Sequence, residues 1–376
     1  MFRVSSLKHS GLLQMAITII IVFLSLIGLI TLHEFGHFIL ARLFNVKVEE
    51  FGIFLPPRIY GKKFGETIYS LNVLPLGAFV KLYGEDERTE DSRSFASKPV
   101  WQRALIVAGG VISFWLIAVV IFAYVFTTGT IQPVLDTDDV PNAKVQVTAV
   151  SANSPASIAK IQPGDFIKSL SLADSPTNVQ TVDKVGQVQD FTGNHKGQPV
   201  VVEVQRMNET LVLNLTPREN PPNGQGAVGV SLVRAAEVSY GFPQAVVKSV
   251  TTTWDLTVNL FSGWGQIIGR LTSGQGMPPG AQFVGPIGIG NLLNQAAQMG
   301  VNYYLQFIAI ISVYLAIFNA LPIPALDGGK LVFLGIEAVR KRPVSEKVEQ
   351  TITAVFFFIL VGLSIFATIG DISRLF

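Results

Sequence analysis

The residue types best suited to chemistry stand together in one short run, His33-Glu34-Phe35-Gly36-His37, which follows an apolar stretch at residues 12–32. Residues four apart share one face of an α-helix, so His33 and His37 can offer two imidazoles to one metal ion while Glu34 reaches a bound water. This is the ligand spacing of a zinc peptidase helix. The alternative is that the histidines only tolerate a membrane interface and that Glu34 begins the next loop.

Other potential metal ligands are few. The chain contains no cysteine, so disulfides and thiolate sites are excluded and zinc would have to use His, Asp or Glu. The histidines are His9, His33, His37 and His195. Asp327 emerges from residues 319–326, where two prolines free backbone groups that need partners. The alternative for Asp327 is a cap for the helix expected to start near Lys330.

The composition indicates a membrane protein. The chain of 376 residues is 49% hydrophobic and 14% charged, which is too apolar for an ordinary soluble protein of this length. The net charge is +2 and no basic cluster is interleaved with aromatic residues, so nucleic acid is not an expected partner. Apolar segments of about 20 residues predict four transmembrane helices, at residues 12–32, 104–126, 304–326 and 351–369. Residues 250–269 are more polar and are predicted to form an amphipathic helix at the membrane surface.

The distribution of Lys and Arg predicts the orientation in the bilayer. Nine of these residues lie in 41–100 and five lie in 327–350, whereas the two tails together hold three. Cytoplasmic loops carry such an excess, so both loops are expected in the cytoplasm and residues 129–303 outside it, together with the termini. At about 1.5 Å per helical residue, the first and third spans then carry His33 and Asp327 to a similar depth.

Two segments between the spans predict β-structure. Residues 67–82 alternate loosely with β-forming residues around a turn at Pro75 and Gly77, which predicts a β-hairpin. Its apolar turn favours insertion into the membrane beside the helix of His37, and the alternative is a small soluble subdomain. Residues 129–235 become polar and contain short β-like runs, which predicts a soluble domain.

Within this soluble domain, a helical turn that starts with proline is followed by Pro163-Gly164-Asp165 and a strand. The pattern resembles a PDZ domain of the bacterial protease-associated type, with Lys160 where that family usually has Gly. PDZ domains capture peptides by strand addition to a sheet edge. The resemblance therefore implies binding of peptide or protein C-termini, in a groove expected near Val147 or Ala149. The alternative is a domain that only occludes access to the membrane site.

A second resemblance covers nearly the whole chain. The run at His33 together with Asn319-x-x-Pro-x-Pro-x-Leu-Asp327-Gly resembles the site-2 protease family of intramembrane zinc metalloproteases, and most closely its bacterial RseP/RasP group, with one PDZ-like domain between the second and third spans. Further similar stretches are Gly77-Ala-Phe-Val-Lys81, Gly285-Pro-Ile-Gly-Ile289 and Arg342-Pro-Val344. The family's Gly-Pro-x-x-Asn appears here as Gly109-Gly-Val-Ile-Ser113, a departure that leaves the metal ligands intact.

The resemblance assigns roles to individual residues. It implies that Zn²⁺ is bound by His33, His37 and Asp327. It implies that Glu34 activates the water and that Asn319 holds substrate backbone, for which the alternative is a hydrogen bond from Asn319 to carbonyls freed by Pro322. Cleavage of a helical substrate requires local unwinding, and an extended segment could pair with the predicted hairpin. Gly77, Phe79 and Val80 are accordingly expected to contact substrate.

The expected protein is a polytopic α-helical membrane protein with four transmembrane helices, a membrane-associated β-hairpin and an inserted α+β PDZ-like domain. The expected boundaries are 1–40 for the first transmembrane helix, 41–100 for the cytoplasmic hairpin region, 101–128 for the second transmembrane helix, 129–235 for the extracytoplasmic PDZ-like domain, 236–303 for an amphipathic membrane-surface linker, 304–326 for the third transmembrane helix, 327–350 for a cytoplasmic loop and 351–376 for the fourth transmembrane helix and tail.

The expected function is metalloendopeptidase activity in or near transmembrane segments of single-span proteins in a bacterial plasma (inner) membrane, as in regulated intramembrane proteolysis. By resemblance, the substrates are anti-sigma factors or signal-peptide remnants. One alternative is a surface-acting membrane zinc endopeptidase, whose third ligand is commonly a Glu on a following soluble helix, but residues 41–100 offer no clear helix of that kind. The other is an inactive PDZ-bearing membrane adaptor, against which the complete ligand set and Glu34 argue.

Overall fold

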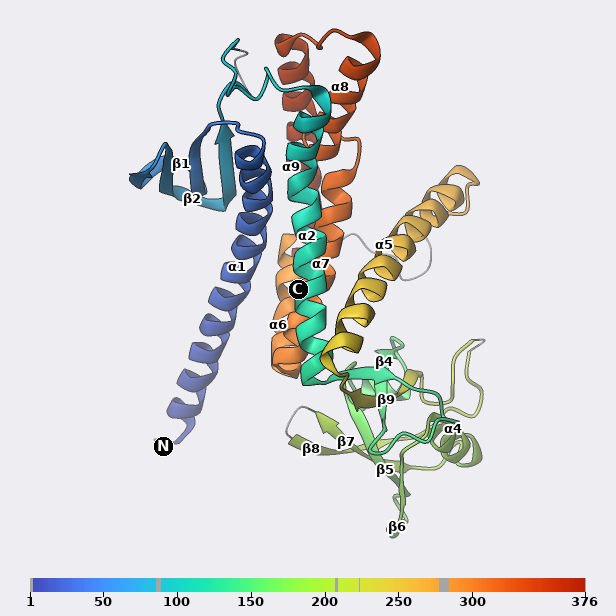
Figure 1. Ribbon diagram of the computed structural model, residues 1–376. Helices are drawn as coiled ribbons and strands as arrows, with labels where there is room; N and C mark the ends of the chain where they lie inside the picture. The colour runs from blue at the N-terminus through green and yellow to red at the C-terminus, as the bar shows by residue number, and fades with distance from the viewer. Residues whose placement is uncertain (1–2, 86–88, 207–208, 223, 277–283, 376) are drawn as a thin grey trace. The chain divides into compact units, whose positions relative to one another are not determined.

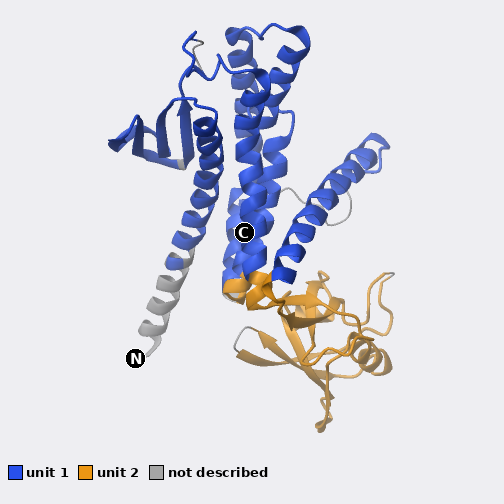
Figure 2. Cartoon of the chain, viewed as in Figure 1, with its two compact units in different colours: residues 1–124, 243–297, 304–376 blue, residues 125–242, 298–303 orange. Residues whose placement is uncertain are grey.

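The computed structural model describes residues 3–85, 89–206, 209–222, 224–276 and 284–375. The chain divides into two compact units, drawn in different colours in Figure 2. Unit 1 consists of Met1–Tyr124, Pro243–Ala297 and Tyr304–Phe376, and unit 2 consists of Val125–Phe242 and Gln298–Tyr303. Helix α2 crosses the boundary between the units after Tyr124.

Unit 1 contains most of the helices (Figure 1). The elements that lie wholly or mainly in unit 1 are α1 (Arg3–Leu43), β1 (Val48–Phe64), β2 (Thr67–Leu82), α2 (Val100–Thr128), α5 (Phe242–Thr272), α6 (Pro286–Met299), α7 (Val301–Ala320), α8 (Asp327–Arg340) and α9 (Glu346–Leu375). Among the described residues, four helical segments are long and apolar enough to cross a membrane: Ile19–Leu43, Val100–Thr128, Val301–Ala320 and Glu346–Ser373. They correspond to the four predicted spans, and α5 is not among them.

The third span is shorter than predicted, and the segment after it is not a plain loop. Helix α7 ends at Ala320, six residues before the expected boundary at Leu326. Pro322 and Pro324 lack the amide hydrogen that continued helix would need, so the chain turns at residues 321–326. Helix α8 then begins at Asp327, slightly before the helix start expected near Lys330, and extends to Arg340 within the segment bounded as a cytoplasmic loop.

The pairing of β2 also differs from the prediction. Residues 67–82 do not turn back on themselves at Pro75, because both halves of β2 pair with β1 and the turn of the hairpin lies at residues 65–66. Gly65 supplies the positive φ of +61° that this turn requires. Through successive register shifts, residues 48–53 have residues 78–82 on one side and residues 68–71 on the other. Within the described part of the chain, no strand pairs with the second edge of residues 78–82.

The turn of this hairpin is tied to its surroundings by charge. The Glu66 carboxylate accepts a hydrogen bond from Arg42 at the end of α1, with an N–O distance of 3.0 Å, and two from Arg93, at 2.5 and 2.8 Å. The Arg93 guanidinium holds the pKa of Glu66 below its ordinary value. These contacts fasten the β1–β2 sheet to the end of α1 that carries the histidines.

The helices of unit 1 meet through small residues and buried hydroxyl groups, as is usual in membrane bundles. A Cβ atom added to Gly36 of α1 would lie 2.3 Å from the Gly109 carbonyl oxygen of α2. Tyr304 of α7 donates to Ser25 of α1 at 2.7 Å, and Ser312 of α7 donates to the Phe114 carbonyl of α2 at 2.8 Å. These contacts hold α1, α2 and α7 together.

Helix α5, in the segment predicted to be an amphipathic linker, has two distinct faces. Its buried residues are small: Ala245, Ser249, Thr253 and Thr257. Thr257 accepts a hydrogen bond from the Trp115 indole of α2 at 3.2 Å. The large apolar side chains of α5, including Trp254 and Phe261, are exposed.

Unit 2 is built on one twisted antiparallel sheet. Its elements are β3 (Thr130–Pro133), β4 (Lys144–Val150), α3 (Pro155–Ile158), β5 (Phe166–Leu172), β6 (Ser175–Thr181), α4 (Val185–Asn194), β7 (Val200–Arg206), β8 (Glu209–Leu215) and β9 (Val230–Val238). The strand order is β3-β9-β4-β5-β7-β8, with β6 paired to β5. Its core consists mainly of valine, leucine and isoleucine side chains.

Three residues named in the sequence analysis, Lys160, Asp165 and Val147, have structural roles in unit 2. Asp165, which is 1% exposed, binds Arg206 through two hydrogen bonds of 2.7 and 2.8 Å. Lys160 has a φ of +62°, a conformation that favours glycine. Val147 is fully buried in the core on β4, which is flanked by β5 and β9. The side chain of Val147 therefore does not line a groove. Ala149 is exposed and, among the described residues, pairs with β9 on one side only, so a groove near Ala149 stays a prediction.

Candidate active site

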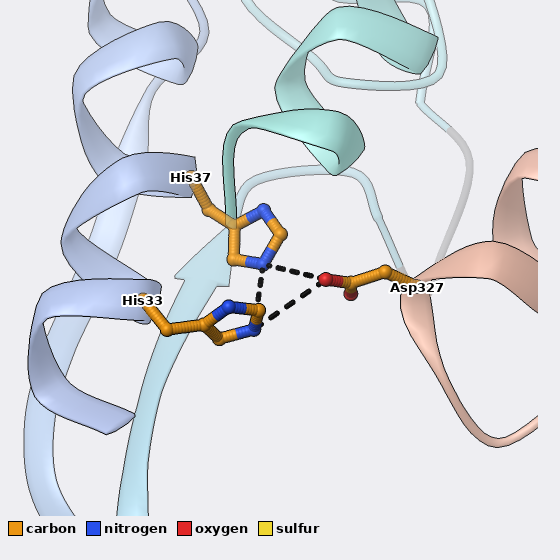
Figure 3. A group of neighbouring side chains, drawn as sticks. All are labelled: His33, His37 and Asp327. Atoms are coloured by element: carbon orange, nitrogen blue, oxygen red, sulfur yellow. Dashed lines mark hydrogen bonds and ion pairs between the residues drawn. The ribbon is translucent and has the colours of Figure 1, made fainter. Parts of the chain in front are cut away.

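Three potential metal ligands converge from two helices of unit 1 (Figure 3). His33 and His37 lie one turn apart on α1, and Asp327 is the first residue of α8. The two Nε2 atoms are 3.4 Å apart, and Asp327 Oδ2 lies 3.4 Å from that of His33 and 3.5 Å from that of His37. Among the described residues, this is the group of His, Asp and Glu side chains that could hold a metal ion.

The spacing of these atoms fits tetrahedral zinc. Zinc bonds to His and Asp of about 2.0–2.2 Å place neighbouring ligand atoms of a tetrahedron about 3.3–3.6 Å apart. His37 Nδ1 lies 2.9 Å from the Ile106 carbonyl oxygen, which can only accept, so this nitrogen carries the proton and Nε2 presents a lone pair. Asp327 Oδ2 is buried with no hydrogen-bond partner among the described residues. The lone pair of His37 Nε2 and the carboxylate of Asp327 face each other, and a cation bound between them would remove their mutual repulsion.

Helix α2 closes the site on one side, and the sequence did not predict this contact. A Cβ atom added to Gly110 would lie 2.3 Å from His37 Nε2 and 2.5 Å from His33 Cε1. The neighbouring Gly109 meets Gly36 of α1 backbone to backbone. The pair of glycines in the middle of an apolar span was the available signal, because glycine there has no side chain to contribute to packing.

The local fold around Asp327 also depends on glycine. A Cβ atom added to Gly328 would lie 2.1 Å from the Leu321 carbonyl oxygen, and one added to Gly329 would lie 2.3 Å from that of Ile323. The first turn of α8 therefore packs against the turn that follows α7. Asp327 is the acidic residue of this first turn, where the helix dipole stabilises a negative charge.

The candidate base Glu34 lies beside the ligands in a pocket of about 430 Å³. The lining residues include His33, Glu34, His37, Val80, Leu82, Glu85, Asn319, Asp327 and Lys330. The Glu34 carboxylate accepts a hydrogen bond from the backbone of Val80 on β2. The same strand thus borders the pocket and orients the carboxylate next to the ligands.

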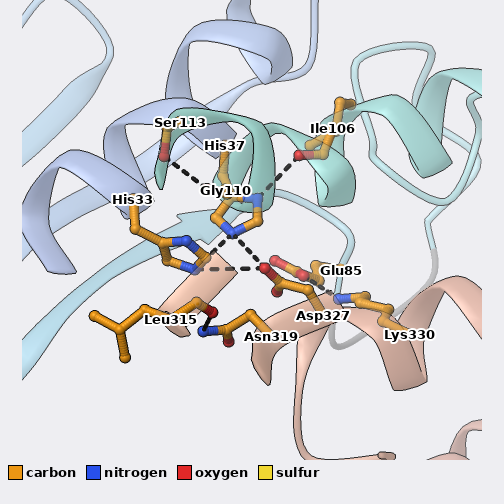
Figure 4. Close-up of polar contacts among 10 residues, drawn as sticks. All are labelled: His33, His37, Glu85, Ile106, Gly110, Ser113, Leu315, Asn319, Asp327 and Lys330. Carbon is orange, nitrogen blue, oxygen red and sulfur yellow. Dashed lines mark hydrogen bonds and ion pairs between the residues drawn. The ribbon is translucent and has the colours of Figure 1, made fainter. Parts of the chain in front are cut away.

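The other predicted substrate-contacting residues divide into two groups. Val80 and Asn319 line the pocket, and the Asn319 amide donates to the Leu315 carbonyl on its own helix at 2.9 Å (Figure 4). Gly77 and Phe79 are not among the lining residues. The Phe79 ring instead lies over Gly52 of β1, within 2.2 Å of where a Cβ atom there would be, so Phe79 packs within the sheet.

The sequence matches known proteins along nearly its full length. It matches peptidase family M50 over residues 21–363. A candidate zinc metalloprotease of Clostridium perfringens (strain 13 / Type A) is 33% identical over 94% of this chain and 98% of its own length. The regulator of sigma-E protease RseP of Escherichia coli (strain K12) is 28% identical over 92% of this chain and 96% of its own. The regulator of sigma-W protease RasP of Bacillus subtilis (strain 168) is 27% identical over 96% and 100%, respectively.

Proposed function

The chain belongs to peptidase family M50, the site-2 protease family of zinc metalloproteases, and from this premise we propose that it cleaves single-span membrane proteins in or near their transmembrane segments. The observation that carries the proposal is the convergence of two His Nε2 atoms and one Asp Oδ2 atom at 3.4–3.5 Å beside a glutamate. These groups lie where candidate membrane-crossing helices border a pocket. An inactive adaptor would not need this complete set.

In the proposed site, His33, His37 and Asp327 hold the zinc ion. Bound zinc supplies a Lewis acid that polarises the scissile carbonyl and acidifies water. The Ile106 carbonyl keeps His37 in the tautomer whose Nε2 can bind the metal. With three protein ligands, a bound zinc ion would keep one coordination position free for water or substrate. A surface-acting zinc endopeptidase would commonly take its third ligand from a soluble helix, whereas Asp327 follows the span α7 after a short turn.

Glu34 is the proposed general base and acid. Its carboxylate takes a proton from the attacking water and later returns a proton to the leaving amine. The backbone of Val80 orients this carboxylate. Asn319 lines the same pocket and is proposed to hold the backbone of the substrate.

The substrate is proposed to bind as an added strand. Residues 78–82 pair with β1 on one side only, among the described residues, and Val80 and Leu82 of this segment line the pocket. An unpaired strand edge offers amide and carbonyl groups to an extended peptide. The scissile segment of a transmembrane helix would therefore unwind before cleavage and pair with this edge. Val80 is retained as a contact residue, and Gly77 and Phe79 would act through the shape of the sheet.

The proposed location is a bacterial inner membrane, with the β1–β2 sheet and α8 towards the cytoplasm and unit 2 outside it. The Lys and Arg excess in residues 41–100 and 327–350 supports this orientation. The names of two relatives describe regulators of sigma factors. On that basis, single-span anti-sigma factors are the proposed substrates, with signal-peptide remnants as a second group.

Unit 2 is proposed to be a PDZ-like domain that screens substrates by binding peptide or protein C-termini. Residues 230–235 of β9 pair with β4, and residues 235–238 pair with β3. Within the described residues, the first part of β9 therefore keeps one edge unpaired by any strand, and α4 packs beside β9. This edge of β9 is the proposed site of strand addition, and the edge of β4 near Ala149 is the alternative.

The test of this function is cleavage of a defined single-span protein reconstituted with the purified enzyme in lipid vesicles. Mass spectrometry of the products should locate the cut inside or next to the transmembrane segment. A chelator should abolish the cleavage and added zinc should restore it. Cuts confined to the soluble tails of the substrate would instead support a surface-acting endopeptidase.

A further inference from the structure

Helix α8, which carries Asp327, contacts the rest of unit 1 through a face on which an apolar residue lies between a cation and an anion. Lys330, Leu334 and Glu337 lie at positions i, i+4 and i+7 and therefore share that face. Each of the two charged residues forms an ion pair with a segment far away in the sequence. Lys330 pairs with Glu85, just beyond the end of β2, and Glu337 pairs with Arg103 of α2.

The pair of Arg103 and Glu337 is bidentate and well buried. The two guanidinium nitrogens lie 3.1 and 2.5 Å from the two carboxylate oxygens of Glu337. The side chains are only 8% and 15% exposed. Breaking such a pair leaves an uncompensated buried charge, so this contact fixes the C-terminal half of α8 on α2.

The pair of Glu85 and Lys330 lies at the other end of the face, in the active-site pocket itself. Both residues are among those that line the pocket, and Figure 4 draws the contact between them beside Asp327. The Lys330 ammonium also lies 5.2 Å from the centre of the Phe95 ring, within cation–π range. Between the two ion pairs, Leu334 is 5% exposed and belongs to the apolar cluster that contains Leu82 and Phe95.

We propose that Glu85 and Lys330 are positioning residues that set the place of the third metal ligand. Lys330 is one helical turn from Asp327, so the pair with Glu85 fixes the distance between the end of β2 and the turn that carries the ligand. The inference rests on the proposed role of Asp327 as a zinc ligand. Strand β2 orients the Glu34 carboxylate through the backbone of Val80. Glu85, which follows β2 closely, holds α8 through its ion pair with Lys330.

The opposite polarity of the two ion pairs makes this placement specific. On α8 the cation Lys330 is near the N-terminus and the anion Glu337 is near the C-terminus. Lys330 pairs with the anion Glu85, and Glu337 pairs with the cation Arg103. A slip of α8 by one turn, about 5.4 Å, would separate both charges from their partners. The apolar contact of Leu334 alone would tolerate smaller displacements, because such contacts are not directional.

The test measures how fast full-length holoenzyme in detergent loses zinc to an excess of chelator. Lys330→Met and Glu85→Gln should each release zinc about 10- to 100-fold faster than wild type, because metal affinity falls by about that factor when groups that orient metal ligands are removed. The charge-exchanged double variant Glu85→Lys/Lys330→Glu should restore slow release. The matched control is Lys168→Met, which breaks an exposed Lys–Glu pair in unit 2, with Glu203 at 3.1 Å, and should release zinc like wild type.

Release at the wild-type rate by Lys330→Met and Glu85→Gln would overturn the proposal, as would a double variant no better than the single ones. Melting temperatures should stay near that of wild type in the variants, and Glu85→Gln keeps the test open should Lys330→Met not fold. Failure of the proposed function is a separate result. In that case wild type would bind no zinc, or Asp327→Asn would hold zinc as tightly as wild type.

Discussion

The imidazoles of His33 and His37 meet α2 at Gly110, so the metal site depends on a residue without a side chain. Gly110→Ala should weaken zinc binding at least about tenfold, because the added Cβ atom, 2.3 Å from His37 Nε2, must displace a ligand. Zinc content after dialysis against a weak chelator measures this. Gly28→Ala is the control, since no atom lies within 4 Å of that added Cβ. Wild-type zinc affinity in Gly110→Ala would contradict the described packing of α1 on α2.

Lys160 provides a test of backbone strain in unit 2. Its φ of +62° is costly for any side chain, so Lys160→Gly should stabilise the sheet by about 1 kcal/mol. Hydrogen exchange of the amides in β5 and β7 of the full-length protein should become slower. Lys184→Gly, at a residue with a φ of −130°, should give no such gain. Faster exchange in Lys160→Gly would show that this position is not strained.

The pairing of His33 with His37 could be predicted from the helical repeat, whereas their contact with Gly110 could not, because Gly110 is distant in sequence. His33 and His37 are four residues apart, so the helical repeat alone brings them to one face. Whether Asp327 binds the metal stays a prediction, but its proximity to both histidines is a feature of the structure. Gly110 could not be assigned, since the histidines that it contacts lie on α1, separated from α2 by β1 and β2, and a glycine carries no functional group that a sequence pattern reveals.

At the scale of elements, the strand formed by residues 78–82 leads to the sharpest expectation. A substrate that pairs with one strand edge presents every second amide to that edge. Single N-methyl groups along the scissile segment of a synthetic substrate should therefore reduce cleavage with a period of two residues. Cleavage rates of the series, measured in vesicles, test this. Equal effects at consecutive positions would contradict strand addition, and a substrate methylated outside the segment serves as control.

The elements themselves were predictable to different degrees. The apolar spans are continuous, so their existence followed from hydropathy, whereas the end of α7 depended on where Pro322 and Pro324 interrupt it. The β1–β2 sheet was predicted in the right region with the wrong partner. Strand β1 contains two adjacent prolines and several charged residues, which obscured its alternation, and its register shifts let it pair with both halves of β2.

At the scale of the whole molecule, the chain lends itself to topology mapping because it contains no cysteine. Single cysteines in place of the exposed residues Lys62 and Lys341 should react with an impermeant thiol reagent only from the cytoplasm. A cysteine in place of exposed Asn194, in unit 2, should react only from outside. Labelling of the Lys341 and Asn194 positions from the same side would refute the proposed order of four spans.

The number of spans and the position of a polar domain between them could be inferred from composition, since both depend on summed hydropathy. The strand order of unit 2 could not, because β9 inserts between β3 and β4 although it is the last strand in sequence. Because β3 pairs only with residues 235–238 of β9, the first part of β9 has one edge that no strand pairs with among the described residues. Peptide capture and simple occlusion can therefore be distinguished by changing residues at the unpaired edge of β9.

The roles of Glu34 and Asp327 can be separated by measuring zinc content and cleavage on the same preparations of wild type, Glu34→Gln and Asp327→Asn. Wild type and Glu34→Gln should each contain about one zinc per chain, because the latter keeps all three proposed ligands. Glu34→Gln should nevertheless lose cleavage, since it lacks the base. Asp327→Asn should lose both zinc and cleavage. Normal turnover by Glu34→Gln, or full zinc retention by Asp327→Asn, would contradict the assignment of this site.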